Sequence, residues 1–89
     1  MQFEWDPEKA RINRTKHGVD FADAIEVLFD PLGLTTSDDS AGEVRHVTLG
    51  NDAFGRLLVV VYGKTRERVR MISARRATRR EREKYQEKP

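Results

Sequence analysis

The sequence predicts an α+β domain in which two N-terminal helices pack on one face of a small antiparallel sheet and a third helix closes the chain. Helix signals occur in residues 6–30 and 78–87, and most strand signals lie in the segment between them. Strand patterning begins after Gly33, and turn-rich stretches separate the strands. Segregation of helices and strands along the chain is typical of the α+β class.

The N-terminal residues predict a short strand followed by a helix. Residues 2–5 are expected to form an edge strand. Asp6 suits an N-cap and Pro7 suits the first helical position. A first helix is therefore expected over residues 7–17, and Gly18 is its C-terminal stop.

A second helix is expected directly after the first. Asp20 is the predicted N-cap, and Asp23 stands at the third helical position in a box-like arrangement. Asp30-Pro31 is the predicted end of this helix. Apolar residues recur at helical spacing within it, namely Phe21, Ala24, Ile25 and Leu28.

Four further segments have strand patterns, and a capping box then opens the last helix. Short connections predict that neighbouring strands pair antiparallel. The strands are expected at Leu34–Ser37, Val44–Leu49, Leu57–Tyr62 and Val69–Ala74. Leu57–Tyr62 is apolar on both faces and is therefore the predicted central strand. The Thr78-Arg79-Arg80-Glu81 box predicts a helix that runs to about Glu87.

Length and composition indicate one small domain without disulfides. Eighty-nine residues are enough for a single core. The chain has no cysteine, which excludes disulfides, thiolate zinc sites and thiol nucleophiles. No apolar leader follows Met1, and no apolar run approaches the length of a membrane span, so the expected location is the cytoplasm and no membrane partner is expected. Neither histidine has metal-ligand spacing, so no metal or other cofactor is expected.

Charge is strongly divided along the chain. Residues 64–89 contain eleven Lys or Arg against four Asp or Glu, a local charge of +7, whereas residues 1–63 carry −5. Arginine keeps its charge at physiological pH and matches phosphate oxygens through its fork of N–H groups. The cluster therefore indicates a polyanion site, and nucleic acid is the first candidate.

The arginines around the start of the last helix are the best candidates for phosphate contacts. Cations in a first helical turn oppose the helix dipole, so they are explained if an anion binds at that helix start. The alternative is a solvated helix surface whose cations pair with acids one turn away. The candidates are Arg75, Arg76, Arg79 and Arg80.

Other candidate residues lie outside this cluster. Arg56 precedes the central strand, whose neighbour carries Arg70 and Arg75, so these side chains are expected to converge, although Arg56 is equally explained as a turn residue. Lys16 and His17 form a polar face with Asn13, one helical turn earlier, at the end of the first helix, where helix capping is the alternative role of His17. His46 alternates with apolar residues and is interpreted as a packed, hydrogen-bonded histidine.

Several motifs in this order resemble the BrnT toxins. FEWDPEKA is followed by N-x-x-KHGVDF-x-x-A, DPL, GRLLVVVY and RVRMISARRATRRERE-x-Y, and the resemblance covers nearly all 89 residues. BrnT toxins are ribonucleases of the RelE/ParE superfamily of type II toxin–antitoxin modules. The resemblance implies a RelE-like fold and metal-independent mRNA cleavage that arrests growth.

The same resemblance implies partners. RNA is the implied substrate, and a BrnA-like antitoxin is the implied inhibitor. The antitoxin binds operator DNA, so the toxin meets DNA only through it. A toxin dimer within the complex is left open.

The resemblance also implies site residues. Gly55-Arg56-Leu57 is similar to the RelE arginine before the central strand, and Arg75 or Arg76 is similar to the arginine after the last strand. Tyr85 is the candidate for the RelE tyrosine. Where RelE has basic residues before its central strand, this chain has DDSAGE with only Arg45 and His46 nearby, so Lys16 and His17 are the candidate substitutes.

Two other functions fit the same residues. One is a non-catalytic module that binds nucleic acid or a protein partner through the same fold. The other is a gyrase poison similar to the ParE branch of the superfamily. Growth arrest with loss of mRNA distinguishes the nuclease from both.

Overall fold

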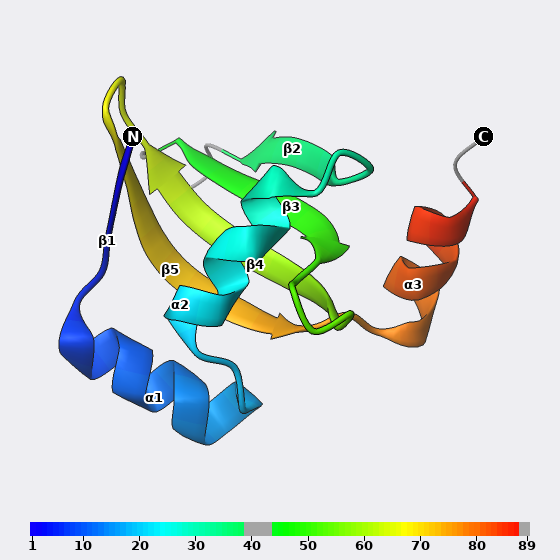
Figure 1. Cartoon of the computed structure of the whole chain (residues 1–89), viewed down its shortest axis with the longest axis horizontal. Helices are drawn as coiled ribbons and strands as arrows, with labels where there is room; N and C mark the ends of the chain where they lie inside the picture. The colour runs from blue at the N-terminus through cyan, green and yellow to red at the C-terminus, as the bar shows by residue number, and fades with distance from the viewer. Residues whose placement is uncertain (39–43, 88–89) are drawn as a thin grey trace.

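The computed structural model describes residues 1–38 and 44–87. Within them, five strands form one sheet in the order β1-β5-β4-β3-β2 (Figure 1). The elements in chain order are β1 (Gln2–Glu4), α1 (Pro7–His17), α2 (Phe21–Ala24), the 3₁₀ helix η1 (Ile25–Phe29), β2 (Leu34–Asp38), β3 (Arg45–Asn51), β4 (Leu57–Lys64), β5 (Arg68–Arg76) and α3 (Arg79–Gln86). The turn expected at residues 38–43 lies, from residue 39 on, outside the described residues.

The sheet is mixed, which corrects the prediction of an antiparallel sheet. Strands β2 to β5 pair antiparallel, as short connections require. The edge strand β1 is confirmed, but it pairs parallel to β5, with Phe3 opposite Val69. The prediction was wrong here because β1 and β5 are not joined by a short connection. Nearly the whole domain lies between them, so their relative direction is not fixed by a turn.

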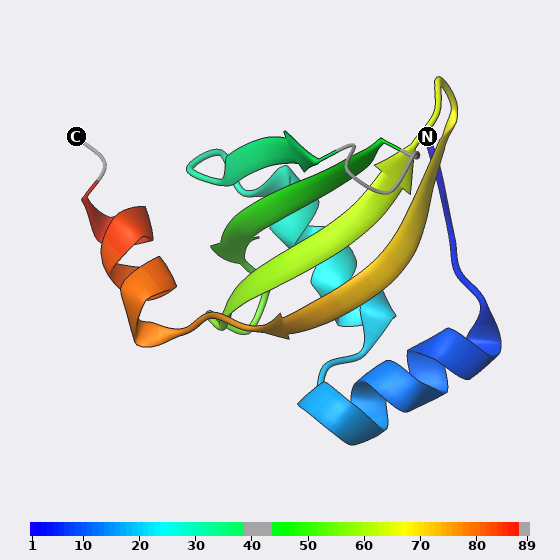
Figure 2. The ribbon, with the colours of Figure 1, turned by 180° about the vertical axis from the view of Figure 1, so that it is seen from behind.

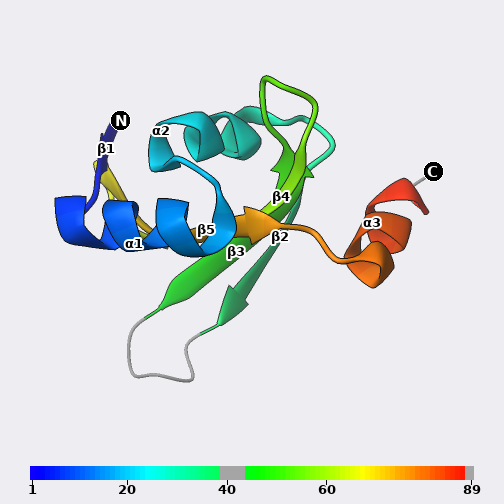
Figure 3. The same cartoon turned by 90° about the horizontal axis from the view of Figure 1, so that it is seen from below.

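Strand β4 lies at the centre of the sheet, as its apolar character predicts. Its side chains alternate between two hydrophobic clusters. Leu58 and Val60 are buried in the larger cluster with residues of α2 and η1. Leu57 and Val59 are buried in a smaller cluster on the opposite face, against which Tyr85 of α3 packs. Figure 3 shows α3 beyond the end of β5, apart from α1 and α2.

Helix α1 has the predicted bounds and runs along the edge of β5. The Asp6 carboxylate accepts a hydrogen bond from the Glu8 backbone N–H at 2.9 Å, and Gly18 has φ +70° at the C-terminal end. Asn13 is buried and exchanges hydrogen bonds of 2.9 and 3.1 Å with the backbone of Ala74. The side-chain amide of Asn13 thereby pairs the backbone N–H and C=O of Ala74, which β1 is too short to reach.

The second helix departs from the prediction. Only residues 21–24 are α-helical, and the continuation is the 3₁₀ helix η1. The side chain of Asp20 makes no cap hydrogen bond. Its carboxylate instead lies 3.3 Å from the Arg14 guanidinium, so the predicted capping box is wrong. Gly50 of β3 lets η1 come close, since a Cβ there would lie 3.2 Å from the Val27 carbonyl oxygen.

Candidate functional site

The arginines cluster where β5 ends and α3 begins. We call Arg75, Arg76, Arg79 and Arg80 the basic corner. The Ala77 N–H donates a 2.9 Å hydrogen bond to the Leu57 carbonyl, so this corner lies beside the start of β4. Figure 2 shows the β3–β4 hairpin, the end of β5 and α3 together at this end of the sheet.

Arg75 is held by an acid of the chain itself. Its two terminal nitrogens each donate a 2.9 Å hydrogen bond to the Glu81 carboxylate. Glu81 also accepts from the Thr78 N–H at 2.8 Å and completes the predicted capping box, which is confirmed. These hydrogen bonds, led by those from Arg75, lower the pKa of Glu81 to about 2. The start of α3 therefore already holds one carboxylate, that of Glu81, and Arg75 is neutralised by it.

Arg56 is also paired, in this case with two acids. Its Nε donates to Oδ2 of Asp52 at 2.7 Å, and its Nη2 lies 3.7 Å from Oδ2 of Asp23. Burial of Asp52 disfavours its charged form, but hydrogen bonds from Arg56 and from the Phe54 N–H outweigh burial and lower its pKa. Only 22% of the Arg56 side chain is exposed, so Arg56 anchors the β3–β4 loop.

The strand register places Arg75 and Arg76 on opposite faces of the sheet. Arg75 lies opposite Val59, whose side chain belongs to the cluster beneath α3. Arg76 lies opposite Leu58, whose side chain points towards α2 and η1. Side chains alternate along a strand, so these neighbours reach different sides of the corner.

The remaining cations of the corner are open to solvent. Within the described part of the chain, neither Arg76 nor Arg80 has an acidic partner within 4 Å, and both are exposed. Arg79 lies 3.5 Å from Glu83 across one helical turn, a weak exposed pair. Arg76 and Arg80 are therefore the cations of the corner that are available to a ligand.

Arg70 lies outside the basic corner, contrary to the expected convergence with Arg56. It pairs with Gly63 near the opposite end of β4, together with Glu4 and Arg68 around a surface pocket. Five residues of strand separate Arg70 from Arg75, or roughly 16 Å. Arg56 precedes β4 at one end of the sheet and Arg70 lies near the other end, so the pairing of β4 with β5 does not bring their side chains together.

Lys16 and His17 lie at the end of β5 that carries Arg76. The hydrogen bonds between Asn13 and Ala74 bring the last turn of α1 to this position. A groove of about 190 Å³ runs between α1 and β5. It is lined by Lys9, Ile12, Asn13, Lys16, His17, Ile72 and Ser73.

Tyr85 lies on the other face of the sheet and fixes α3. Its ring packs against the smaller cluster of Leu49, Leu57 and Val59. Its hydroxyl is bonded to Asp30, and this hydrogen bond, with burial, raises the pKa of Tyr85. His46 is stacked on Tyr62 with ring centroids 5.5 Å apart, in accord with its interpretation as a packed histidine.

Asp52 and Phe54 contribute to this geometry but are not among the candidate residues selected from the sequence. Asn13 belongs to the predicted polar face at the end of α1, but its bonding role was not predicted. Asn13 donates to the carbonyl of Val19, six residues on, and bonds to Ala74, 61 residues away, and no local pattern can reveal the second contact. The segment Asp52-Ala53-Phe54-Gly55 does contain a local signal for the turn that holds Asp52 and Phe54. Asp at the first position of a turn and Gly at the fourth are typical of a tight turn.

In residues 1–38 and 44–87, no helix is long and apolar enough to cross a membrane. The same residues contain no group of three or more His, Cys, Asp or Glu side chains arranged to hold a metal ion.

An exposed, partly unpaired arginine corner on a small α+β domain defines a protein suited to binding a polyanion. The family described as the ribonuclease toxin BrnT of type II toxin–antitoxin systems matches residues 5–81, and the chain belongs to this family. The crystal structure of the Brucella abortus ribonuclease toxin BrnT superposes with a TM-score of 0.72 at 26% identity, over 89% of this chain and 99% of that one. No curated protein sequence matches.

Proposed function

We propose that this chain is an endoribonuclease toxin that cleaves mRNA without a metal ion and is neutralised by a BrnA-like antitoxin. Membership of a family of ribonuclease toxins supports the activity. The observation that carries the site is the exposed Arg76 at the end of β5, which has no acidic partner among the described residues and stands four residues before the exposed Arg80 in the chain. A guanidinium in this state is free to bind a phosphate through two parallel N–H donors.

The proposed chemistry is attack by the ribose 2′-oxygen on the adjacent phosphorus. A base takes the 2′-hydroxyl proton, the P–O5′ bond breaks, and an acid protonates the leaving 5′-oxygen to leave a 2′,3′-cyclic phosphate. Arg76 neutralises the charge that develops on the phosphate oxygens. Arg56, which Asp52 holds in place, is proposed to contact a neighbouring phosphate oxygen. Arg75 lies on the opposite face of the sheet, and its proposed contribution is to fix the start of α3 through Glu81.

Proton transfer is assigned to the last turn of α1. His17 is half-buried beside the groove between α1 and β5, and an imidazole nitrogen can donate or accept a proton in general acid–base catalysis. Lys16 supplies a further cation next to it. Tyr85 is a poorer candidate because its proton is directed at Asp30 on the other face of the sheet.

The other candidates bind flanking nucleotides. Arg79 and Arg80 are proposed to bind further phosphates along α3. Arg70 is proposed to bind a phosphate of the same RNA that lies farther from the cleaved bond. Such contacts are sequence-independent and salt-sensitive. They supply affinity to this site, whereas Arg76 supplies transition-state stabilisation.

Induced expression and a purified assay test this function together. We expect growth arrest with loss of intact mRNA, and we expect the purified protein to cleave RNA in excess EDTA. Cleavage restored only by a divalent metal would contradict the metal-independent mechanism. Growth arrest with DNA damage and intact RNA would instead indicate a gyrase poison, and unaffected growth with intact RNA would indicate a binding module.

A further inference from the structure

Phe54 is a large apolar side chain that the fold does not bury. It lies in the loop between β3 and β4, and 71% of its surface is exposed. Single exposed apolar residues are common on protein surfaces. Phe54 differs from such residues because its backbone is fixed and because a cation, Arg56, lies near its ring.

The loop that carries Phe54 is held by one buried carboxylate. The Asp52 Oδ1 accepts from the Phe54 N–H at 2.9 Å and from the Arg56 N–H at 2.8 Å. The backbone adds bonds from Gly55 to Asp52 and from Asp52 to Arg56. Gly55 has φ +80°, a conformation that closes a three-residue hairpin loop. The position of Phe54 is therefore set before any ligand arrives.

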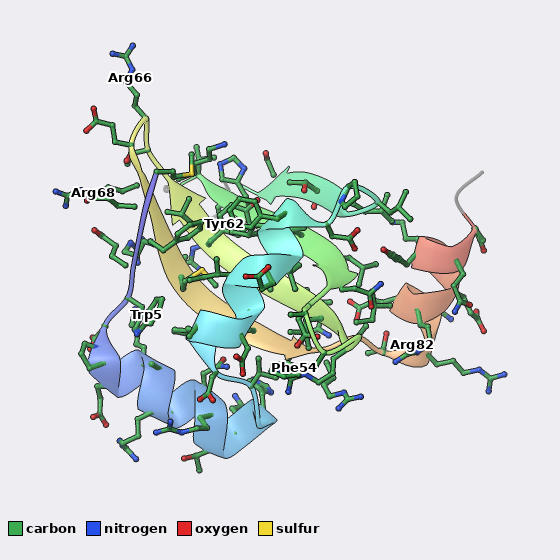
Figure 4. All side chains as sticks on the ribbon, in the orientation of Figure 1. Trp5, Phe54, Tyr62, Arg66, Arg68 and Arg82 are labelled. Carbon is green, nitrogen blue, oxygen red and sulfur yellow. The ribbon has the colours of Figure 1, made fainter. Side chains whose placement is uncertain are left out.

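The ring of Phe54 stands beside the basic corner. The Arg56 guanidinium carbon lies 5.6 Å from the ring centroid, within cation–π range. The bond between Ala77 and Leu57 joins this end of β4 to the segment that contains Arg76. Figure 4 shows Phe54 at the end of the sheet where β5 leads into α3, far from Arg66 and Arg68 at the opposite end.

We propose that Phe54 is a base-stacking residue that holds an unpaired nucleobase beside the phosphate bound at Arg76. This inference rests on the proposed function, since it names the part of the RNA that the same site recognises. Proteins bind single-stranded RNA by stacking unpaired bases on aromatic rings and arginine planes, next to cations that hold the phosphates. Phe54 provides the aromatic ring for stacking, and Arg56 provides a guanidinium plane beside it. Arg76 provides the cation for the phosphate at the same end of the sheet.

Substitutions of Phe54 and of Arg76 should differ in how they change RNA affinity and its dependence on salt. The probe is a mixed-sequence single-stranded RNA with 2′-O-methyl groups, which cannot be cleaved because its nucleophile is blocked. Phe54→Ala should weaken binding about 5- to 100-fold. Phe54→Tyr should keep the affinity, whereas Phe54→Leu should not restore it. The dependence of affinity on salt should not change in Phe54→Ala, but it should become shallower in Arg76→Ala.

Phe29→Ala is the matched control. Phe29 is a second exposed phenylalanine, 66% open, but it lies on η1 against Phe3, away from the basic corner. Its removal should leave RNA binding unchanged. The thermal midpoint of each variant shows that the fold is intact, and Phe54→Ala should match the parent because the ring is exposed.

Each other outcome overturns the inference. Equal RNA affinity of Phe54→Ala and the parent would remove the stacking role, and equal rescue by Leu would replace stacking with apolar contact. Loss of antitoxin binding with RNA affinity intact would make Phe54 a protein-docking residue. If the parent protein neither binds the probe nor cleaves RNA, the proposed function fails and the inference fails with it.

Discussion

The Tyr85 hydroxyl donates a 2.6 Å hydrogen bond to Oδ2 of Asp30, a residue 55 positions earlier in the chain. The Asn51 side chain donates to the same hydroxyl at 3.3 Å, so three segments meet at one phenol. Near the start of α3, the ion pair between Arg75 and Glu81 joins the helix to β5 at a second point. These contacts hold the exposed arginines of α3 in a fixed position relative to the end of β5.

Tyr85→Phe should therefore loosen α3. The variant keeps the ring that packs on the sheet but loses a hydrogen bond to a carboxylate, which costs about 1–2 kcal/mol in a half-buried position. Urea unfolding measures this difference. Hydrogen exchange of the α3 amides should rise in the same variant. Unchanged stability and exchange would show that the hydroxyl does not anchor the helix.

The Arg75–Glu81 pair predicts a specific acid sensitivity. The pKa of Glu81 in the folded protein is about 2, compared with an ordinary value of 4.5. A lowered folded-state pKa contributes stability above the ordinary value, and this contribution is lost as the pH falls from about 4.5 towards 2. Arg75 is 39% exposed, so solvent screening limits the contribution to about 1 kcal/mol.

Glu81→Gln should make the free energy of unfolding less dependent on pH in this acidic range. Unfolding free energies at pH 6 and pH 3 should differ less in the variant than in the parent. Glu83→Gln is the control because, among the described residues, the carboxylate of Glu83 makes just the exposed pair with Arg79. An identical profile in the parent and in Glu81→Gln would mean that the pair contributes nothing to stability.

Local signals predict the parts of this fold that depend on neighbouring residues. Asp6, Pro7 and Gly18 define α1, and the apolar character of β4 places it at the centre of the sheet. The parallel pairing of β1 with β5 could not be predicted in this way, since it joins the two ends of the domain. Antiparallel pairing was inferred from short connections, and these two strands have none.

The site was predicted less completely than the fold. The sequence identifies the cluster of arginines but not which of them are neutralised. Arg56 is paired with Asp52, which opens the β3–β4 turn, and Arg75 is paired with Glu81 in the first turn of α3, and such pairs depend on backbone geometry. The strand register decides that Arg76 and Arg75 point to opposite faces. Neither relationship can be read from composition or spacing.

Asp52→Ala should be among the most destabilising single substitutions in the β3–β4 hairpin. The carboxylate is fully buried and accepts hydrogen bonds from two backbone N–H groups and the Arg56 guanidinium. Removing it leaves these donors unsatisfied, at a cost of about 2–4 kcal/mol. Ala53→Ser, at the neighbouring exposed position, is the control and should be neutral. A parent-like urea midpoint for Asp52→Ala would contradict the anchoring role.

Arg76→Ala should abolish cleavage while leaving the fold intact. The side chain is exposed and unpaired, so its loss removes little packing, whereas the proposed transition state loses its phosphate contact. Arg76→Lys should also be poor because an ammonium cannot make the bidentate contact. Arg66→Ala removes an exposed arginine at the opposite end of the sheet and should remain active (Figure 4). Equal toxicity of Arg76→Ala and the parent would remove Arg76 from the site.

The charge division predicts how the antitoxin inhibits. A segment with net charge +7 attracts an acidic partner, and complementary charge accelerates encounter. We expect the antitoxin to cover Arg76, Arg80 and part of α3, which excludes RNA by direct occlusion. Association should slow with added salt, and dissociation should depend more on the apolar contacts. Arg80→Glu should reduce the association rate more than Arg66→Glu, which changes the same charge at the far end of the sheet. A complex in which the corner stays open to solvent would rule out occlusion, because RNA could then still reach Arg76.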